Sequence, residues 1–454
     1  MRRILIVLAA LVCAVAVVSA KDIRVPSEHA TIQAAIDSAG SGDVILVSAG
    51  TYRERIALKP GVVLKSAGDD ARGELGLKRA ETTIIDGGGA DGSRTPGVTL
   101  AEGATLDGFT VTRVGLYDDA RWKKSWEKKG EDQSHDPIGN FGVPAVAVIG
   151  TTCRVANNIV HHNGDIGIAI RGVEGKACSP EVSGNTSYRN MGGGIGSMKG
   201  STAKIDSNHC FENFFAGIGC DGAHPTITNN NCHENIRGGI GISEGSSPTV
   251  RGNRCYGNRR AGIGIRTGAD TRPIVEGNKC EGNEMAGIGV KEEARPTLRG
   301  NRCLRNKLAG IGCNTADLVI EGNHLEGNLK AGIGVSGRSK ARLTRNKCLN
   351  NRLVAVGIVD ESVATLEGNT LSREGGMPPI IMIATKAAAT LKDNHLRGGG
   401  VAGILVGGRL NASGNTLKGD NRGTGIVLKK GSQATLTDNE ISDYKQAVRD
   451  QREK

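Results

Sequence analysis

Six polar residues in two stretches of the chain have side chains suited to acid–base chemistry. They are His135, Asp136, His161, His162, Asp165 and Arg171. A histidine can act as a base, a carboxylate can orient that base or hold a metal, and an arginine can clamp a negative charge. Such a set could abstract a proton α to the carboxyl group of a uronic acid, with Ca²⁺ as cofactor if the reaction is a lyase reaction. The alternative is ordinary polar loop residues, since no tight cluster of acids marks a calcium site.

The elements that must position these residues follow from a repeated phrase, N-x-C-x-x-N-x-x-x-G-I-G, with a period of about 23 residues. Its first Asn is Asn208, Asn230, Asn253, Asn278, Asn301, Asn323 and Asn346, with a looser continuation to Asn439. A fixed period of this length is typical of a solenoid, and Gly and Asn favour tight turns between short strands. We therefore predict an all-β chain, a parallel β-helix of about fifteen coils.

The position two residues after the repeating Asn indicates which side of each coil faces the core. Cys occupies it at Cys210, Cys232, Cys255, Cys280, Cys303 and Cys348, and Leu, Val or Ile in most other coils. We predict that this position is buried, with Cys as a small apolar residue. Occasional disulfides between coils and a metal–thiolate column are the alternatives. The Asn itself is expected to form an internal ladder of side-chain amides that closes the turns.

The Gly-Ile-Gly strands are predicted to have a bare outer face. Strand alternation points the Ile inward and the second Gly outward. This second Gly recurs at Gly196, Gly219, Gly241, Gly264, Gly289, Gly312 and Gly334. A mid-strand Gly costs about 0.5–1 kcal/mol relative to Ala, so the column indicates the close approach of a flat ligand or of another part of the chain. With Gly219, Gly241, Gly264 and Gly289 as a floor, outward residues such as Asp221, Arg266 and Lys291 could form one wall of a substrate-binding groove.

A polar insert interrupts the repeat at residues 113–143. It contains both tryptophans of the chain, Trp122 and Trp126, whose i,i+4 spacing places them on one face of a helix. Long loops of solenoids often lie on the binding face, so the pair could stack on a sugar. The alternative is that the insert is a lid and that the pair packs against the solenoid.

The N-terminus predicts export. Arg2 and Arg3 precede an apolar run from Ile4 to Val18, and cleavage after Ala20 fits a signal peptide over residues 1–20. The run is short for a membrane span, so we expect no transmembrane segment in the mature chain and a secreted or periplasmic location. Removal of the two arginines and no acids would lower the net charge from +11 to +9.

The remaining positive charge recurs along successive coils. Representative residues are Arg251, Arg254, Arg260, Lys279, Arg299 and Arg305. Stacked basic columns could attract a polyanion such as an acidic polysaccharide or an anionic envelope polymer, or could serve only solubility. Nucleic acid is disfavoured as a partner because aromatic residues make up only 3% of the chain.

Residues 30–39 have apolar side chains at helical spacing, followed by Gly42-Asp43-Val44-Ile45-Leu46-Val47 and Gly50-Thr51-Tyr52. This segment resembles the entry cap of right-handed parallel β-helix proteins of the pectin-lyase-like superfamily. The resemblance implies a right-handed coil and a short helix over the open end. It also implies that the Gly-Ile-Gly strands form the sheet whose outer face carries catalysis in the lyases and epimerases. We expect a cap and first strand at residues 21–52, a β-helix at 53–442 and a C-terminal tail at 443–454.

Two functional hypotheses follow. In the first, the protein is an exported monomer that binds an extended anionic carbohydrate or an envelope partner along its solenoid face. In the second, it is a lyase or epimerase of uronic-acid polymers that uses the six polar residues. The bare glycine face favours the first, because it carries no acid, base or nucleophile.

Overall fold

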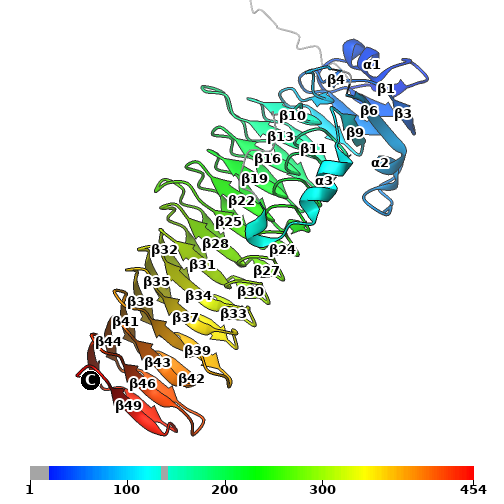
Figure 1. Cartoon of the computed structure of the whole chain (residues 1–454). Coiled ribbons are helices and arrows are strands. Elements are labelled where there is room, and N and C mark those ends of the chain that lie inside the picture. Colours follow the sequence, from blue (N-terminus) through cyan, green and yellow to red (C-terminus); the bar gives the residue numbers. More distant parts are fainter. Residues whose placement is uncertain (1–19, 91, 134–141, 454) are drawn as a thin grey trace, which may run out of the picture.

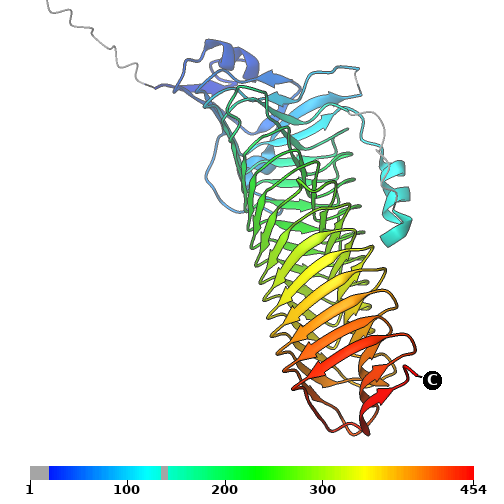
Figure 2. The same ribbon diagram turned by 90° about the vertical axis from the view of Figure 1, so that its left-hand side faces the viewer.

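The chain forms a long rod of stacked coils with the N-terminal cap at one end and the C-terminus at the other (Figures 1 and 2). The structure is a computed structural model that describes residues 20–90, 92–133 and 142–453. Three parallel sheets run along the rod, one on each side of the coil. The prediction of an all-β parallel β-helix is therefore confirmed. The segment 1–19 and the candidate residues His135 and Asp136 lie outside the described residues.

The first sheet has 17 strands. They are β1 (Asp22–Val25), β2 (Val44–Val47), β5 (Val63–Ser66), β8 (Thr105–Asp107), β11 (Arg154–Ala156), β14 (Glu181–Ser183), β17 (Lys204–Asp206), β20 (Thr226–Thr228), β23 (Thr249–Arg251), β26 (Ile274–Glu276), β29 (Thr297–Arg299), β32 (Asp317–Glu321), β35 (Lys340–Thr344), β38 (Val363–Glu367), β41 (Ala388–Lys392), β44 (Arg409–Ser413) and β47 (Gln433–Thr437).

The second sheet has 16 strands, and we call it the aromatic sheet after the stacked rings of β12 to β24. Its strands are β3 (Gly50–Tyr52), β6 (Thr83–Gly89), β9 (Thr110–Val114), β12 (Ile159–His161), β15 (Thr186–Tyr188), β18 (His209–Phe211), β21 (Asn231–His233), β24 (Arg254–Tyr256), β27 (Lys279–Glu281), β30 (Arg302–Leu304), β33 (His324–Glu326), β36 (Lys347–Leu349), β39 (Thr370–Arg373), β42 (His395–Gly398), β45 (Thr416–Lys418) and β48 (Glu440–Ser442).

The third sheet also has 16 strands and carries the Gly-Ile-Gly segments, so we call it the glycine sheet. Its strands are β4 (Ile56–Ala57), β7 (Val98–Thr99), β10 (Val146–Ile149), β13 (Ile168–Arg171), β16 (Ile195–Met198), β19 (Ile218–Asp221), β22 (Ile240–Ser243), β25 (Ile263–Ile265), β28 (Ile288–Lys291), β31 (Ile311–Asn314), β34 (Ala331–Ser336), β37 (Val354–Ile358), β40 (Ile381–Ile383), β43 (Ala402–Val406), β46 (Thr424–Leu428) and β49 (Gln446–Asp450).

The core consists of columns of equivalent side chains from successive coils. Cys210, Cys232, Cys255, Cys280 and Cys303 pair in register along the aromatic sheet and are fully buried. No disulfide joins the ten cysteines in the described part of the chain. The prediction that this position is a core position is therefore confirmed.

Buried asparagines close the turns, as predicted. The Asn253 side chain donates to the backbone carbonyls of Ile227 and Arg251 and to the Asn278 side chain, which also accepts the Asn253 backbone N–H. Its own side-chain oxygen accepts from Asn230. A second ladder, formed by the later Asn of each phrase, follows the same pattern at the next turn, for example from Asn258 to Asn283. These bonds satisfy backbone groups that the turns would otherwise leave buried and unpaired.

A helix covers the N-terminal end of the rod, and a last strand of the glycine sheet forms its C-terminal end. Helix α1 (Ile32–Ser38) begins at Thr31, whose hydroxyl accepts the backbone N–H of Ala34, and it buries Ile32 and Ile36 over the first coil. A second short helix, α2, spans Lys78–Thr82. At the other end, the segment that we expected to be a tail contains β49, which pairs with β46 and continues the glycine sheet.

Candidate functional site

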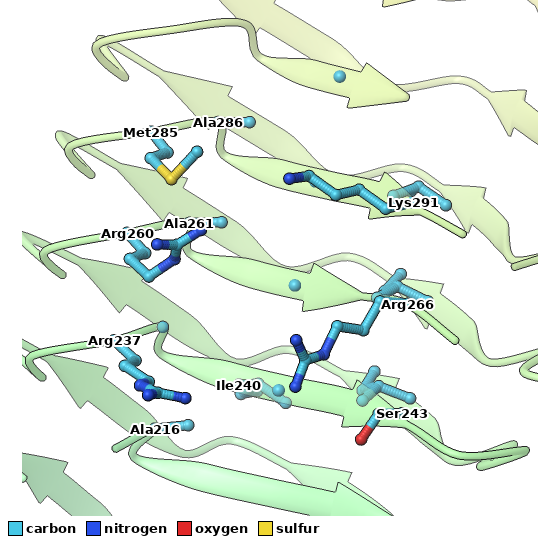
Figure 3. Close-up of a pocket in the computed structure, with 18 of the residues that line it drawn as sticks. Ala216, Arg237, Ile240, Ser243, Arg260, Ala261, Arg266, Met285, Ala286 and Lys291 are labelled. Atoms are coloured by element: carbon cyan, nitrogen blue, oxygen red, sulfur yellow. The ribbon is translucent and has the colours of Figure 1, made fainter. Parts of the chain in front are cut away.

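A groove of about 850 Å³ runs along the outer face of the glycine sheet (Figure 3). Its floor is the outward glycine of each strand, and the glycines pair in register from coil to coil. The column comprises Gly196, Gly219, Gly241, Gly264, Gly289, Gly312, Gly334 and Gly357. A parallel column of small residues, including Ala216, Ala261 and Ala309, lies beside it in the same lining. The structure thus extends the sequence-predicted column by Gly357.

The two glycines of each Gly-Ile-Gly segment are glycine for different reasons. A Cβ on Gly262 would lie 2.7 Å from the Gly287 carbonyl oxygen, so packing between coils excludes a side chain there. Among the described residues, no atom lies within 4 Å of the place of a Cβ on Gly264 or on Gly219. At these two positions neither the described neighbours nor the backbone conformation requires glycine.

The walls of the groove carry positive charge in its central part. Arg237, Arg260 and Met285 follow one another on one side, and Ser243, Arg266 and Lys291 stand on the other (Figure 3). Arg266 and Lys291 point back across the floor in Figure 3. Burial, and after it the neighbouring Arg266, lower the pKa of the Arg260 guanidinium. Asp221 lines the same wall as Arg266 two coils earlier.

Larger side chains limit the floor at both ends of the groove. At the N-terminal end, the Ile166 side chain lies 3.2 Å from the place of a Cβ on Gly196. At the C-terminal end, Met382 takes the register position after Gly357. The bare floor therefore has a finite length, and seven coil-to-coil steps of roughly 4.8 Å give about 34 Å.

The polar insert packs along the turns that join the aromatic sheet to the glycine sheet. Helix α3 (Asp119–Trp126) is capped by Asp118, and the 3-10 helix η1 (Gly130–Asp132) follows it. Trp122 is buried with Phe214 and Ile236, and its indole N–H donates to the Glu212 carbonyl at 2.7 Å. In Figure 2 the helix stands along the side of the rod.

The two tryptophans contact the protein and do not line the groove. Their rings stack with centroids 4.9 Å apart. The Arg189 guanidinium lies 4.3 Å from the Trp122 ring centroid and that of Arg259 lies 3.8 Å from the Trp126 ring centroid. Of the two interpretations, the structure favours packing over sugar stacking, because these contacts already use the rings.

The end of the insert reaches the groove. The Gly130 backbone N–H donates to the Arg259 carbonyl at 2.8 Å, and Arg260 donates to the Gln133 carbonyl. Glu131 lines the groove beside Arg260. Arg260 therefore fixes the insert to the wall.

The described candidate acid–base residues lie on different surfaces. His161 and His162 contact each other through their Nδ1 atoms at 2.8 Å, with His161 at the end of β12 in the aromatic sheet. Asp165 lines the groove, and burial raises its pKa. Arg171 is exposed at the far end of β13. The structure brings the two histidines together, but it places them on another sheet from Arg171.

Sequence reasoning missed a ladder of rings on the aromatic sheet. His161, Tyr188, Phe211, His233 and Tyr256 stack with centroid separations of 4.9, 4.9, 5.1 and 4.6 Å. Each ring directly follows the core position of its coil, so the repeat spacing held the signal. The stacking of rings on neighbouring strands stabilises the sheet.

Acidic side chains interrupt the predicted basic columns. Arg251 pairs with Glu276 at 2.8 Å, Arg299 pairs with Glu321 at 3.3 Å, and Arg305 pairs with Glu281. The outer turns are therefore partly neutralised between coils.

Comparison with known proteins identifies the architecture. A family model described as right handed beta helix region matches residues 139–272 and 221–371, together more than half of the chain. No curated protein matches the chain. Within the described residues, no helix combines the length and the apolar character needed to cross a membrane.

Solved structures with a similar fold are of low sequence identity. The A-module of a mannuronan C-5 epimerase from Azotobacter vinelandii is 14% identical over 92% of each chain, with a TM-score of 0.36. The catalytic unit of an α-1,3-glucanase from Streptomyces thermodiastaticus is 14% identical over 91% of this chain and 65% of that chain, with a TM-score of 0.40. XylC in complex with xylose is 11% identical over 73% of this chain and 84% of that chain, with a TM-score of 0.46. On the family match and the three parallel sheets, the chain belongs to the right-handed β-helix family.

Proposed function

We propose that this protein binds an elongated anionic ligand, an acidic carbohydrate or another component of the cell envelope, along the glycine groove. The observation that carries the proposal is that no atom of the described residues lies within 4 Å above Gly219 and Gly264. Packing against the described residues does not demand glycine at six of the mid-strand positions, Gly219, Gly241, Gly264, Gly289, Gly312 and Gly334. Each of these glycines costs the fold about 0.5–1 kcal/mol, so together they cost several kcal/mol. A ligand that approaches the backbone closely explains why the floor is bare.

The cations in the central part of the groove favour a negatively charged ligand. Arg266 and Lys291 extend over the floor, and Arg237 and Arg260 stand opposite. Cations that face a partly enclosed groove attract anions more strongly than cations on an open surface. The signal-like segment at residues 1–20 supports export, and we propose that a monomer meets the ligand in the periplasm or the medium.

Proton NMR of alginate, pectate and a sulfated polymer, with and without Ca²⁺, tests this proposal. We expect the polymer signals to broaden on addition of the protein while the covalent structure stays unchanged. Gly264→Leu should abolish the broadening, because leucine fills the open space above the floor. Thr297→Leu is the matched control, since it adds a leucine to the outer face of the first sheet and should leave binding unchanged. Equal binding by Gly264→Leu and the wild type would contradict the proposal.

The same spectra test the second hypothesis, a lyase or epimerase. Among the described candidates, Asp165 lines the groove, and burial raises its pKa, as suits an acid catalyst. Turnover would appear as signals of unsaturated ends or epimerised residues, and Asp165→Asn should then remove them. An unchanged polymer would contradict the enzyme hypothesis and leave binding as the only one of the two proposed functions.

A further inference from the structure

The groove changes character along its length. In the coils of β22, β25 and β28 its walls carry Arg237, Arg260, Arg266 and Lys291, and we call this part the cationic half. In the coils of β31 to β40 the lining is mainly apolar, and we call this part the apolar half. Its apolar side chains include Leu308, Ala309, Ala331, Val354 and Met382. Ala309, Ala331 and Val354 form a buried cluster of their own, apart from the core, with Met382 packed against it.

The apolar half offers few partners for sugar hydroxyls. The Ser336 hydroxyl in its lining already donates to the Cys313 carbonyl at 2.8 Å. The Asn314 amide donates to the same Ser336 hydroxyl at 3.3 Å. A buried hydroxyl without a hydrogen-bond partner costs about 1–3 kcal/mol, so a saccharide chain would bind poorly here. An apolar chain would lose nothing by the same contact.

The length of the apolar half fits one acyl chain. Four coil-to-coil steps from β28 to β40, at roughly 4.8 Å each, give about 19 Å. The hydrocarbon core of a bilayer is about 30 Å thick, so one acyl chain spans roughly 15 Å. Met382 then stands where the chain would end.

We propose that the ligand is an anionic amphiphile with a single acyl chain, whose head group lies between Arg266 and Lys291 and whose chain lies over Gly312, Gly334 and Gly357. The inference rests on the proposed function, since both use the same groove. Charge complementarity places the head group, and burial of methylene groups against the alanine and glycine floor holds the chain. Lys330, at the edge of the apolar half, can cover the chain with its own methylene stem while its ammonium group stays in water.

Isothermal titration calorimetry with hexadecyl phosphate, below the concentration at which it forms micelles, tests the inference on the whole protein. We expect one molecule to bind per chain. Dodecyl phosphate should bind more weakly by roughly tenfold or more, because four buried methylenes are lost. Inorganic phosphate should bind more weakly still.

Two variants separate the halves of the groove. Gly334→Leu should weaken the binding of hexadecyl phosphate by about tenfold or more and leave the binding of inorganic phosphate unchanged, since leucine here blocks only the place of the acyl chain. Arg266→Gln should weaken the binding of both compounds, and Thr297→Leu should weaken the binding of neither. Equal affinity for the two alkyl phosphates, together with an unaffected Gly334→Leu, would overturn the inference. If alginate still bound and Gly264→Leu still abolished that binding, the proposed function would stand with a polysaccharide ligand. If neither alginate nor hexadecyl phosphate bound, both proposals would fail.

Discussion

At the scale of single residues, the aromatic sheet carries two pairs of histidines in contact. Within each pair, the two nitrogen atoms that face each other cannot both carry a proton. His209 and His233 face each other through Nε2 atoms 2.6 Å apart, and His233 also contacts Glu234 through Nδ1 at 2.8 Å. His161 and His162 are related in the same way through Nδ1. Burial, and after it the partner histidine, lower the pKa of both His161 and His209 from 6.5 to about 4.

These shifts predict a loss of stability in mild acid. The unfolded chain binds a proton at each histidine near pH 6.5, whereas the folded chain does so only near pH 4. Between these values the unfolded state holds more protons, so the stability is fully present above about pH 6.5 and falls as the pH drops towards 4. Circular dichroism should therefore show a lower Tm at about pH 5.5 than at about pH 7.5.

The variant His161→Phe keeps a ring in the ladder and removes one titrating group. Its Tm should fall less over the same interval than the Tm of the wild type. An equal fall in the two proteins, or a wild-type Tm that does not change, would contradict the assigned pKa of His161.

At the scale of elements, the Gly-Ile-Gly segments of β19 to β34 in the glycine sheet each combine a structural glycine with one that the described residues leave uncrowded. Sequence alternation predicted the outward direction of the second glycine in the Gly-Ile-Gly strands, because a period of two is a local property of a strand. It did not predict the ends of the groove. Ile166 and Met382 block the floor only through their positions against neighbouring coils, where the repeat phrase is weak.

Alanine substitution separates the two kinds of glycine. Gly262→Ala should destabilise the protein, since its Cβ would lie 2.7 Å from a backbone carbonyl oxygen and 2.9 Å from the Asn283 amide. Gly264→Ala should instead raise the free energy of unfolding by about 0.5–1 kcal/mol, because the new Cβ meets no described atom within 4 Å and the unfolded chain loses freedom. Urea titration of each variant measures the difference. A destabilised Gly264→Ala would show that the floor is glycine for a reason internal to the fold.

At the scale of the whole molecule, the sequence repeat was sufficient to predict the architecture but not the contacts on the surface. The core column headed by Cys210 and the ladder of asparagines were predictable because each coil repeats them. Packing of the tryptophan pair against the solenoid was one of the two expectations, but the partners of Trp122, Phe214 and Ile236, were not predictable, since they lie on coils far along the chain. The ionic pairing of Arg251 with Glu276 likewise depends on which residues stack, and it reduces the basic columns expected from composition.

The central claim, that the glycine groove is the ligand site, is tested most directly by crystal structures of the protein soaked with an alginate oligomer and, separately, with hexadecyl phosphate. The account predicts ordered ligand over Gly264 and Gly289, with its anionic group within hydrogen-bond distance of Arg266 or Lys291. Ligand ordered on the aromatic sheet or on the first sheet, with the groove holding only solvent, would contradict it.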